Sequence, residues 1–290
     1  MIHALTIDVE DYHNVIARDW LGRDGPPTEA VVLNTQRLLR HLDASNTKAT
    51  FFVLGEVAET FPELIREIAG LGHELGVHGY CHRQVFKLTP ETFRCEVGDA
   101  KSRIEDIAQV EVVGHRAPAF SINPDTQWAL EVLAELGFRY DSSIFPISGR
   151  RYGWPGSPQD IHEMTLPGGR SIIEAPLTTV PILGHRLPAC GGGYLRHFPG
   201  WVTRWAIRHV QRRRPAIVYM HPYEIEVGCG PLDTSALSPE QARRVHRFHG
   251  LQLRNRHTVE RKLLRLLGGF EFAPLGRVIA LTREGGRGNV

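Results

Sequence analysis

Short apolar runs alternate with stretches of helical spacing along most of the chain. Runs typical of buried strands occur at residues 4–7, 49–54, 74–77, 110–113, 138–140, 171–174 and 216–220. Between them, apolar residues recur every three or four positions, the spacing of amphipathic helices, at residues 28–42, 62–71, 89–107, 123–136 and 200–213. Repeated strand–helix units imply parallel strands joined by right-handed crossovers. We therefore expect an α/β fold, and seven or eight such units close most simply into a distorted (β/α) barrel.

Two stretches interrupt this alternation. Residues 142–170 are rich in Gly, Pro and Ser and too long for a simple connection, so we expect them to fold over one face of the barrel. Residues 181–200 look like a second such loop and contain Gly191-Gly192-Gly193-Tyr194. A glycine triplet is more often a simple bend, but Tyr194 is a candidate for substrate contact.

Polar side chains follow the predicted strands at the end where each strand stops. These positions are Asp8, Glu10 and Asp11 after the first strand, His78 and His82 after the third, and Arg116, Asp141 and His221 after later ones. In a parallel α/β barrel these strand ends open onto one face, where active sites are built. The sequence thus predicts that acid/base groups and metal ligands from distant segments converge.

Each element is weak evidence by itself. His78 and His82 form the chain's only His-x-x-x-His pair, a spacing that suits two imidazoles on one face of a helical turn. For an isolated pair the simpler interpretation is two structural or exposed histidines. Beside the carboxylates of residues 8–11, however, the pair supplies ligands for one metal ion and leaves positions open for water and substrate. Arg116 would orient an acidic base, and His221 is suited to general-acid catalysis because histidine titrates near neutral pH.

Five motifs in order along the chain resemble one known family. They are Thr-Ile-Asp-Val-Glu-Asp at residues 6–11, His-Gly-Tyr-Cys-His at 78–82, Arg-Ala-Pro-Ala-Phe at 116–120, Tyr-Asp-Ser-Ser at 140–143 and Val-Tyr-Met-His at 218–221. Together they resemble the polysaccharide deacetylases with a NodB-like homology domain, carbohydrate esterase family four. Lys-Ala-Thr-Phe-Phe-Val at residues 48–53 is similar to the family's second strand. The Asp-Val-Glu-Asp-Tyr opening and His-Pro-Tyr-Glu at 221–224 resemble the branch found near exopolysaccharide and exosortase loci, which carries an extra C-terminal segment.

The resemblance implies a distorted (β/α) barrel with seven parallel strands that binds Zn²⁺ or a similar divalent ion. Carried over to this sequence, Asp8 would be the general base, His78 and His82 metal ligands, Arg116 the residue that orients Asp8, and His221 the general acid. The oxyanion would be shared between the metal and a backbone N–H near Ala119. Ala119, Phe120 and Asp141 fall in motifs that contact substrate or shape its groove.

The sequence departs from the family at the carboxylate ligand. The common pattern has two adjacent aspartates, the second of which binds the metal, and here Val9 occupies that place. Glu10 or Asp11 must take over this role. Glu10 is favoured because alternate residues of an extended strand point the same way, so it would project beside Asp8.

Composition limits the remaining possibilities. Of 290 residues 42% are hydrophobic, and the formal net charge is +2, which excludes intrinsic disorder. No apolar stretch is long enough for a membrane span, and the opening residues lack the pattern of a secretory signal. The four cysteines, without a Cys-x-x-Cys pair, are typical of reduced thiols, so we expect a cytoplasmic protein.

Two basic segments raise the question of partners. One is a helical stretch with Arg204, Arg208 and residues 212–214. The other is residues 236–270, which carry a local charge of +6 and leave −4 on the rest of the chain. Such asymmetry can indicate an anionic glycan, a membrane surface or nucleic acid, but is more often a solvated helix face. Without an aromatic-studded basic motif we expect no nucleic-acid partner. Peripheral contact with a membrane or a lipid-linked glycan remains open, as does the oligomeric state.

The sequence therefore predicts a deacetylase barrel at residues 1–235 and a basic C-terminal extension at 236–290 packed on it. The predicted activity is metal-dependent hydrolysis of N-acetyl groups on the amino sugars of a polysaccharide or lipid-linked glycan, in exopolysaccharide synthesis. Two alternatives stay open: hydrolysis of another non-peptide C–N bond, such as that of a cyclic imide, and a glycan-binding barrel without activity.

Overall fold

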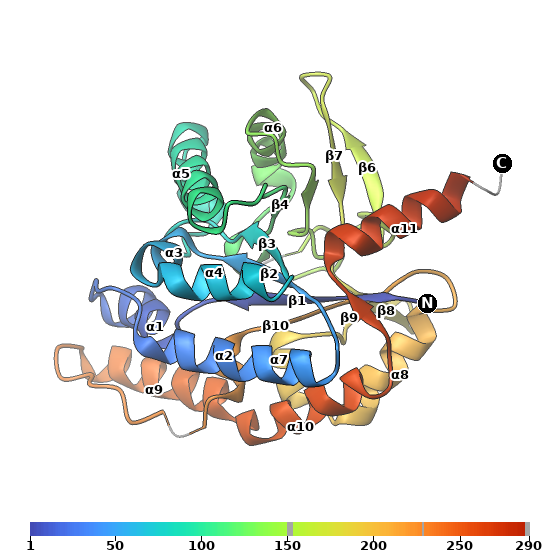
Figure 1. Cartoon of the computed structure of the whole chain (residues 1–290). Helices are drawn as coiled ribbons and strands as arrows, with labels where there is room; N and C mark the ends of the chain where they lie inside the picture. The colour runs from blue at the N-terminus through green and yellow to red at the C-terminus, as the bar shows by residue number, and fades with distance from the viewer. Residues whose placement is uncertain (150–152, 228, 288–290) are drawn as a thin grey trace.

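A computed structural model describes residues 1–149, 153–227 and 229–287. Within these residues the centre of the molecule is a curled sheet of nine strands in the order β10-β1-β2-β3-β4-β5-β7-β6, with β11 also paired to β1 (Figure 1). The main strands are β1 (His3–Val9), β2 (Thr50–Val53), β3 (Glu74–Val77), β4 (Gly114–His115), β5 (Tyr140–Asp141), β6 (His162–Thr165), β7 (Ser171–Glu174), β10 (Ile217–Met220) and β11 (Phe272–Ala273).

The sheet is parallel apart from its last strand. Seven strands, from β10 through β1 to β7, each pair in parallel with their neighbours, and only β6 is antiparallel among the strands described in this sheet. β10 and β6 stand at its two ends, so the sheet forms an open half-barrel. This confirms the predicted α/β class, a distorted (β/α) barrel.

Helices cover both faces of the sheet. The α-helices are α1 (Tyr12–Leu21), α2 (Glu29–Ala44), α3 (Gly55–Thr60), α4 (Pro62–Gly70), α5 (Pro90–Ala108), α6 (Trp128–Glu135), α7 (Gly192–His197), α8 (Gly200–Val210), α9 (Pro239–Leu253), α10 (Arg256–Leu267) and α11 (Leu275–Arg287). Short 3₁₀ segments are η1 (Val85–Lys87), η2 (Pro118–Phe120), η3 (Pro124–Thr126) and η4 (Pro222–Ile225). Among the described helices, none has both the length and the apolar character needed to cross a bilayer.

Local sequence signals explain several helix starts. Thr89 accepts a hydrogen bond from the backbone N–H of Thr92 and is followed by Pro90 at the first helical position of α5. Asn123 caps η3 in the same way, again followed by a proline. Between such helices, all seven residues of β1 are buried, as expected of a strand covered on both faces.

The fourth strand lies further along the chain than its apolar pattern predicts. The run at residues 110–113 is not a strand, and Val110 is 43% exposed; the pairing residues are Gly114 and His115. A side chain at Gly114 would clash with β5, because a Cβ there would lie 2.2 Å from Cζ of Tyr140. Close approach of β4 to β5 thus selects the glycine, and Arg116 directly follows the strand.

The two interrupting stretches carry structure of their own. Residues 142–170, of which 150–152 lie outside the described residues, include β6, which pairs antiparallel with β7. Residues 181–200 contain most of a hairpin of β8 (Thr179–Ile182) and β9 (His185–Pro188), followed by α7. Gly191 and Gly192 have φ of +149° and +49°, and a Cβ at either position would lie 2.3 or 2.6 Å from the ring of Tyr219 and clash with it.

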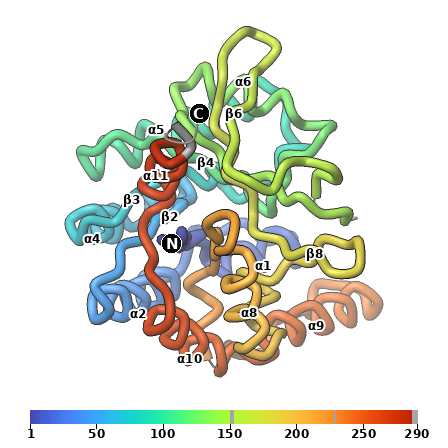
Figure 2. Tube along the Cα trace, turned by 90° about the vertical axis from the view of Figure 1, so that its right-hand side faces the viewer, coloured from blue at the N-terminus to red at the C-terminus, as the bar shows by residue number. Residues whose placement is uncertain are grey.

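The C-terminal residues wrap around the barrel rather than trailing from it. α9 and α10 lie along the lower side of the molecule in Figure 1, and β11 then pairs with the beginning of β1. Figure 2 shows this last segment, in red, passing beside the N-terminus. Most arginines of the basic segments are exposed, but Arg256 is buried and Lys262 donates to the carbonyls of Leu195, Arg196 and Phe198 at the end of α7. The division at residue 235 stays a prediction.

Candidate active site

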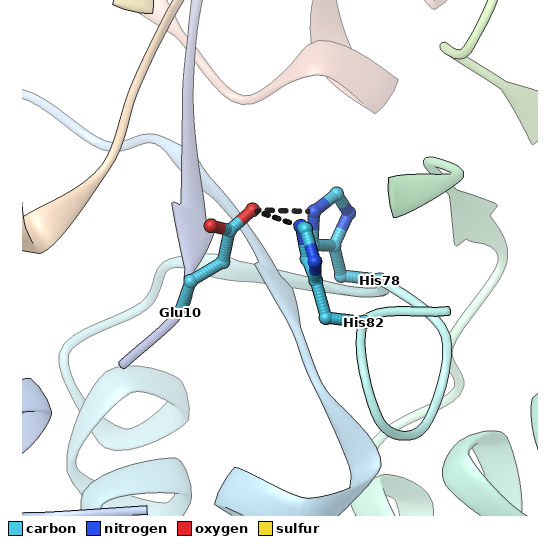
Figure 3. A group of neighbouring side chains, drawn as sticks. All are labelled: Glu10, His78 and His82. Atoms are coloured by element: carbon cyan, nitrogen blue, oxygen red, sulfur yellow. Dashed lines mark hydrogen bonds and ion pairs between the residues drawn. The ribbon is translucent and has the colours of Figure 1, made fainter. Parts of the chain in front are cut away.

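Glu10, His78 and His82 form a compact cluster at the carboxyl ends of β1 and β3. Oε1 of Glu10 lies 3.0 Å from Nε2 of His78 and 3.1 Å from Nε2 of His82. Figure 3 shows both imidazoles turned toward the same carboxylate oxygen. All three side chains are buried, and their ligand atoms lie within 4.8 Å of one another. The cluster joins parts of the chain that are almost 70 residues apart.

An irregular turn, not a helical one, brings the two histidines together. The chain leaves β3 at Val77 and turns at Gly79, where φ is +81°. That left-handed conformation is easily adopted only by glycine. His82 also has a positive φ, of 55°. The His-x-x-x-His spacing predicted two imidazoles on one face of a helical turn. In the structure an irregular turn at residues 78–82 sets the separation of the two rings.

The donor set of this cluster fits a divalent cation. Nδ1 of His78 lies 2.8 Å from the backbone carbonyl oxygen of Arg116. When Nδ1 carries the proton and donates it to this oxygen, the lone pair of Nε2 is free to bind a metal. Nδ1 of His82 is buried without a hydrogen-bond partner in the described part of the chain. Burial would raise the pKa of Glu10, but the charges of His82 and His221 and the hydrogen bonds from His78 and His82 hold it well below its usual value. Two imidazole nitrogens and an ionised carboxylate are ligands that zinc takes, with positions left for water and substrate.

Asp11, the other candidate ligand, serves the start of α1. Its Oδ1 accepts the backbone N–H of His13 at 3.1 Å, and its Oδ2 accepts that of Thr28 at 2.5 Å. Asp11 is thus the N-cap of α1 and also fixes the residue before α2. The structure places Glu10, and not Asp11, with the two imidazoles.

Asp8 and Arg116 form a buried ion pair beside the cluster. Nη1 of Arg116 donates to Oδ1 of Asp8 at 2.8 Å and to the hydroxyl of Thr6 at 2.7 Å. The other guanidinium nitrogens bind the carbonyl and hydroxyl of Ser142, and the group lies 4.4 Å from the centre of the Phe52 ring. Arg116 is fully buried and Asp8 is 1% exposed. The guanidinium therefore fixes Oδ1 and leaves Oδ2 facing the site.

His221 completes the group from β10. Its Nε2 lies 3.9 Å from Oδ2 of Asp8 and 3.7 Å from Oε1 of Glu10, while its Nδ1 lies 3.3 Å from Oε2 of Glu224. The ring also stacks on Tyr223 at 4.8 Å. Burial lowers the pKa of His221, but the charge of Glu10 and the hydrogen bond and charge of Glu224 outweigh it and raise the pKa to about 9. The imidazole is therefore protonated at neutral pH and has a proton to donate.

These groups line a cavity of about 510 Å³. Its wall includes Ala119, Phe120 and Tyr194, three of the four residues predicted to contact substrate. The fourth, Asp141, is not among the cavity's described lining residues. It is fully buried behind the site, 2.7 Å from Nδ1 of His115, and accepts hydrogen bonds from the Ser143 hydroxyl and backbone N–H. Asp141 therefore supports the segment of residues 142–143, in which Ser142 also binds Arg116.

Sequence reasoning missed much of the cavity wall. The missed lining residues come from α1, the end of α7 and the residue after it, η4 and α9: Tyr12, Val15, Ile16, Asp19, Trp20, Arg196, His197, Phe198, Tyr223, Glu224, Phe248, Leu251 and Gln252. Tyr12, Tyr223 and Glu224 carried a signal, since they belong to motifs quoted above. Trp20 of α1 and Phe248 of α9 stack with ring centres 4.1 Å apart, so the C-terminal segment closes one side of the cavity.

Fold and site together define an open α/β half-barrel with a two-histidine, one-carboxylate centre at the ends of its parallel strands. Residues 24–140 match the family model described as "Polysaccharide deacetylase", and residues 142–280 match a "Domain of unknown function (DUF3473)". The chain carries the polysaccharide deacetylase domain of the NodB (CE4) family, followed by this second segment.

Curated relatives agree with this assignment. Over 110 residues, 37% of this chain, the sequence is 34% identical to "Peptidoglycan deacetylase-like protein FGM2" of Gibberella zeae, covering 32% of that protein. Over 158 residues, 50% of this chain, it is 29% identical to "Peptidoglycan-N-acetylglucosamine deacetylase" of Bacillus cereus, covering 54%. The matches thus span between a third and about half of these relatives' lengths.

A solved structure shares the fold over nearly the whole chain. A "putative polysaccharide deacetylase" from Mycobacterium smegmatis superposes with a TM-score of 0.60 and 22% identity, covering 97% of this chain and 90% of that one. At this identity the likeness concerns the fold.

Proposed function

We propose that this chain is a metal-dependent hydrolase that removes N-acetyl groups from the amino sugars of a polysaccharide or lipid-linked glycan. The observation that carries the proposal is the convergence of five side chains at one cavity, with Arg116 bound to Asp8 behind its wall. The five are Asp8, Glu10, His78, His82 and His221. The deacetylase names of the matching relatives support it.

Glu10, His78 and His82 would hold the cation. When bound, it supplies Lewis-acid polarisation of the acetyl carbonyl and lowers the pKa of a water molecule. We propose Zn²⁺ as the native ion, because nitrogen ligands with one carboxylate suit it.

Asp8 is the proposed general base. Its Oδ1 is held by Arg116, so the free Oδ2 is the atom that takes a proton from the attacking water. Arg116 acts through Asp8 as a positioning residue, because its buried guanidinium also binds Thr6 and Ser142 and cannot turn away.

His221 is the proposed general acid. Its Nε2 faces both carboxylates of the site and would give its proton to the departing sugar amine. Glu224 holds the opposite ring nitrogen and so fixes the ring's orientation. Around them, Phe120 and Tyr194 offer aromatic faces to the sugar, and a backbone N–H near Ala119 would stabilise the oxyanion.

An exopolysaccharide setting completes the proposal and rests on the sequence motifs. A location at the cytoplasmic face of a membrane is also proposed and rests on the four free cysteines and a lipid-linked substrate. Subcellular fractionation and the glycan profile of a deletion strain test these two points separately from the chemistry.

Acetate release tests the activity. We expect the purified protein with added Zn²⁺ or Co²⁺ to release acetate from N-acetylglucosamine oligomers or another N-acetylated glycan. Asp8→Asn should lower kcat by roughly 10²–10⁴-fold with an unchanged circular dichroism spectrum. Asp43→Asn, at an exposed position of α2, is the matched control and should behave as wild type.

Two outcomes would contradict the proposal. If no N-acetylated glycan releases acetate with either metal, the proposed activity is wrong. Ring opening of a cyclic imide, or glycan binding without turnover, would then identify which alternative holds. Full activity of Asp8→Asn would remove the assigned base.

A further inference from the structure

A second group of metal-ligating side chains lies outside the active site. His13 comes from α1, whereas Glu226 and Cys229 come from the segment that follows η4. Their ligand atoms lie within 4.8 Å of one another, and Nε2 of His13 is 2.9 Å from Oε1 of Glu226. The three side chains are half-buried, so the group is protected but reachable from solvent.

The cluster connects two segments that also carry active-site residues. α1 begins two residues after Glu10 and contributes Tyr12 and Trp20 to the cavity wall. Glu226 follows η4, the short helix after His221. The cluster uses none of the side chains that surround the cavity, so it is a separate group.

Charges around the cluster favour a divalent cation. Asn34 donates to Oε2 of Glu226 at 3.3 Å and leaves Oε1 toward His13. Nη1 of Arg256 donates a hydrogen bond to Sγ of Cys229 at 3.2 Å. With His13 neutral and Cys229 as thiolate, the formal charges of Asp11, Glu226, Cys229 and Arg256 sum to −2, which one divalent ion balances.

We propose that His13, Glu226 and Cys229 form a second cation site, distinct from the Glu10–His78–His82 centre, for a thiophilic divalent ion such as Zn²⁺. Imidazole, carboxylate and thiolate are all zinc ligands, and a water molecule can complete the coordination. The site has a structural role: it ties α1 to the segment after η4, across 213 residues of chain, and so steadies two walls of the cavity. Because such an ion binds only the folded protein, it should also raise thermal stability.

Cobalt substitution distinguishes the two sites, because only the second contains a thiolate. Titration of the apo-protein with Co²⁺ should show two equivalents bound, with thiolate-to-cobalt charge-transfer absorption in the near ultraviolet. Cys229→Ser should abolish this absorption and bind one equivalent, and so should His13→Gln. Glu10→Gln should keep the absorption.

Matched thiol variants control the assignment. Cys81→Ser removes the thiol next to His82, and Cys95→Ser removes an exposed thiol of α5; both should retain the absorption and two equivalents. The proposal is overturned if the wild-type protein shows no thiolate–cobalt absorption. The side chains of the cluster would then pair with one another and bind no ion. Persistence of the band in both Cys229→Ser and His13→Gln would equally overturn it. Neither result depends on deacetylase activity, so failure here leaves the proposed function standing.

Discussion

At the scale of single residues, Glu10 and Asp11 show how neighbours in the chain take different tasks. The Glu10 carboxylate lies against two imidazoles, whereas both Asp11 oxygens accept backbone N–H groups. Strand periodicity placed Glu10 beside Asp8, but sequence alone could not exclude Asp11. Its Oδ1 caps α1, and its Oδ2 is bound because residue 28 folds back onto Asp11, a contact that no local sequence pattern records.

Substitution of these two carboxylates should therefore have different effects. Glu10→Gln is expected to lose the active-site cation, because it removes the one carboxylate of the cluster. Asp11→Ala should bind metal as wild type does but lower the free energy of unfolding by about 1 kcal/mol, the usual value of a helix cap. Calorimetric metal titration and urea unfolding of both variants provide the measurements. Loss of metal binding in Asp11→Ala, with Glu10→Gln unaffected, would reverse the assignment.

Other residue-scale features had no readable signal in the sequence. Arg116 was predicted from its position after a strand, but its bonds to Thr6 and Ser142 depend on three strands meeting. Asp141 was expected at the substrate groove, yet its partners turn it toward the interior. Which way a side chain at a strand end points is decided by tertiary partners, and these are absent from a local pattern.

At the scale of elements, the connection between α4 and β3 contains a buried histidine. Nδ1 of His73 accepts the backbone N–H of Ala49, which requires the neutral ring. Burial, with the nearby charge of Lys48, lowers the pKa of His73 to about 4 from the ordinary 6.5. Because the unfolded chain binds the proton more readily, the stability contributed by neutral His73 is complete above pH 6.5 and is lost as the pH falls toward 4.

Replacing His73 with a residue that keeps the hydrogen-bond acceptor but cannot titrate should weaken the pH dependence of stability. Asn at position 73 can place an oxygen near the position of Nδ1, so the melting temperature of His73→Asn should fall less steeply than that of wild type between pH 6.5 and 4. His257→Asn, at an exposed position of α10, is the control and should follow wild type. Thermal melts across this pH range measure the difference, and parallel curves for all three proteins would refute the role of His73.

An aromatic contact is part of the contribution of helix α9 to the cavity wall. Phe248 stacks on Trp20 of α1, and both rings line the cavity. Aromatic pairs contribute about 0.5–1.5 kcal/mol beyond the area they bury. We expect Phe248→Ala to raise KM up to about tenfold with little change in kcat, because the contact is remote from the reacting atoms.

Steady-state kinetics on an N-acetylated oligosaccharide would measure this effect. Leu264→Ala, which removes a 47% exposed side chain of α10, should leave both constants unchanged. A fall in kcat with constant KM in Phe248→Ala would instead give α9 a part in the chemical step.

Elements were predictable where local pattern and tertiary pairing agree. β3 falls on its predicted residues 74–77, and α5 begins at the predicted Thr-Pro pair. β4 was displaced because close packing on Tyr140 selects a glycine, which no apolar pattern marks. α1 escaped notice because Asn14, Arg18 and Asp19 interrupt its apolar face.

At the scale of the whole molecule, the C-terminal residues complete the barrel's core. Leu275, Val278 and Ile279 of α11 pack in one buried cluster with Ala4, Phe52 and Ile217 of the sheet. Because β11 also pairs with β1, we expect the barrel and the predicted extension at 236–290 to unfold as one unit. The charge of residues 236–270 predicted a solvated helix face, so the buried sides of α9 and α10 were not expected from the sequence.

Tryptophan fluorescence can test this cooperativity, because all five tryptophans lie before residue 206. Leu275→Ala removes a fully buried side chain and should cost about 2–5 kcal/mol. If the molecule is one unit, the urea midpoint seen by fluorescence should shift as far as that seen by circular dichroism. An unmoved fluorescence midpoint would mean that the extension unfolds independently. Leu264→Ala, on the exposed side of α10, provides the matched control.

The account depends most on a divalent cation bound by Glu10, His78 and His82. Anomalous diffraction at the zinc absorption edge, from crystals reconstituted with Zn²⁺, measures this directly. We predict a strong peak about 2.0–2.2 Å from Nε2 of both histidines and from a carboxylate oxygen of Glu10. Zinc-loaded crystals without density at that position would contradict the account.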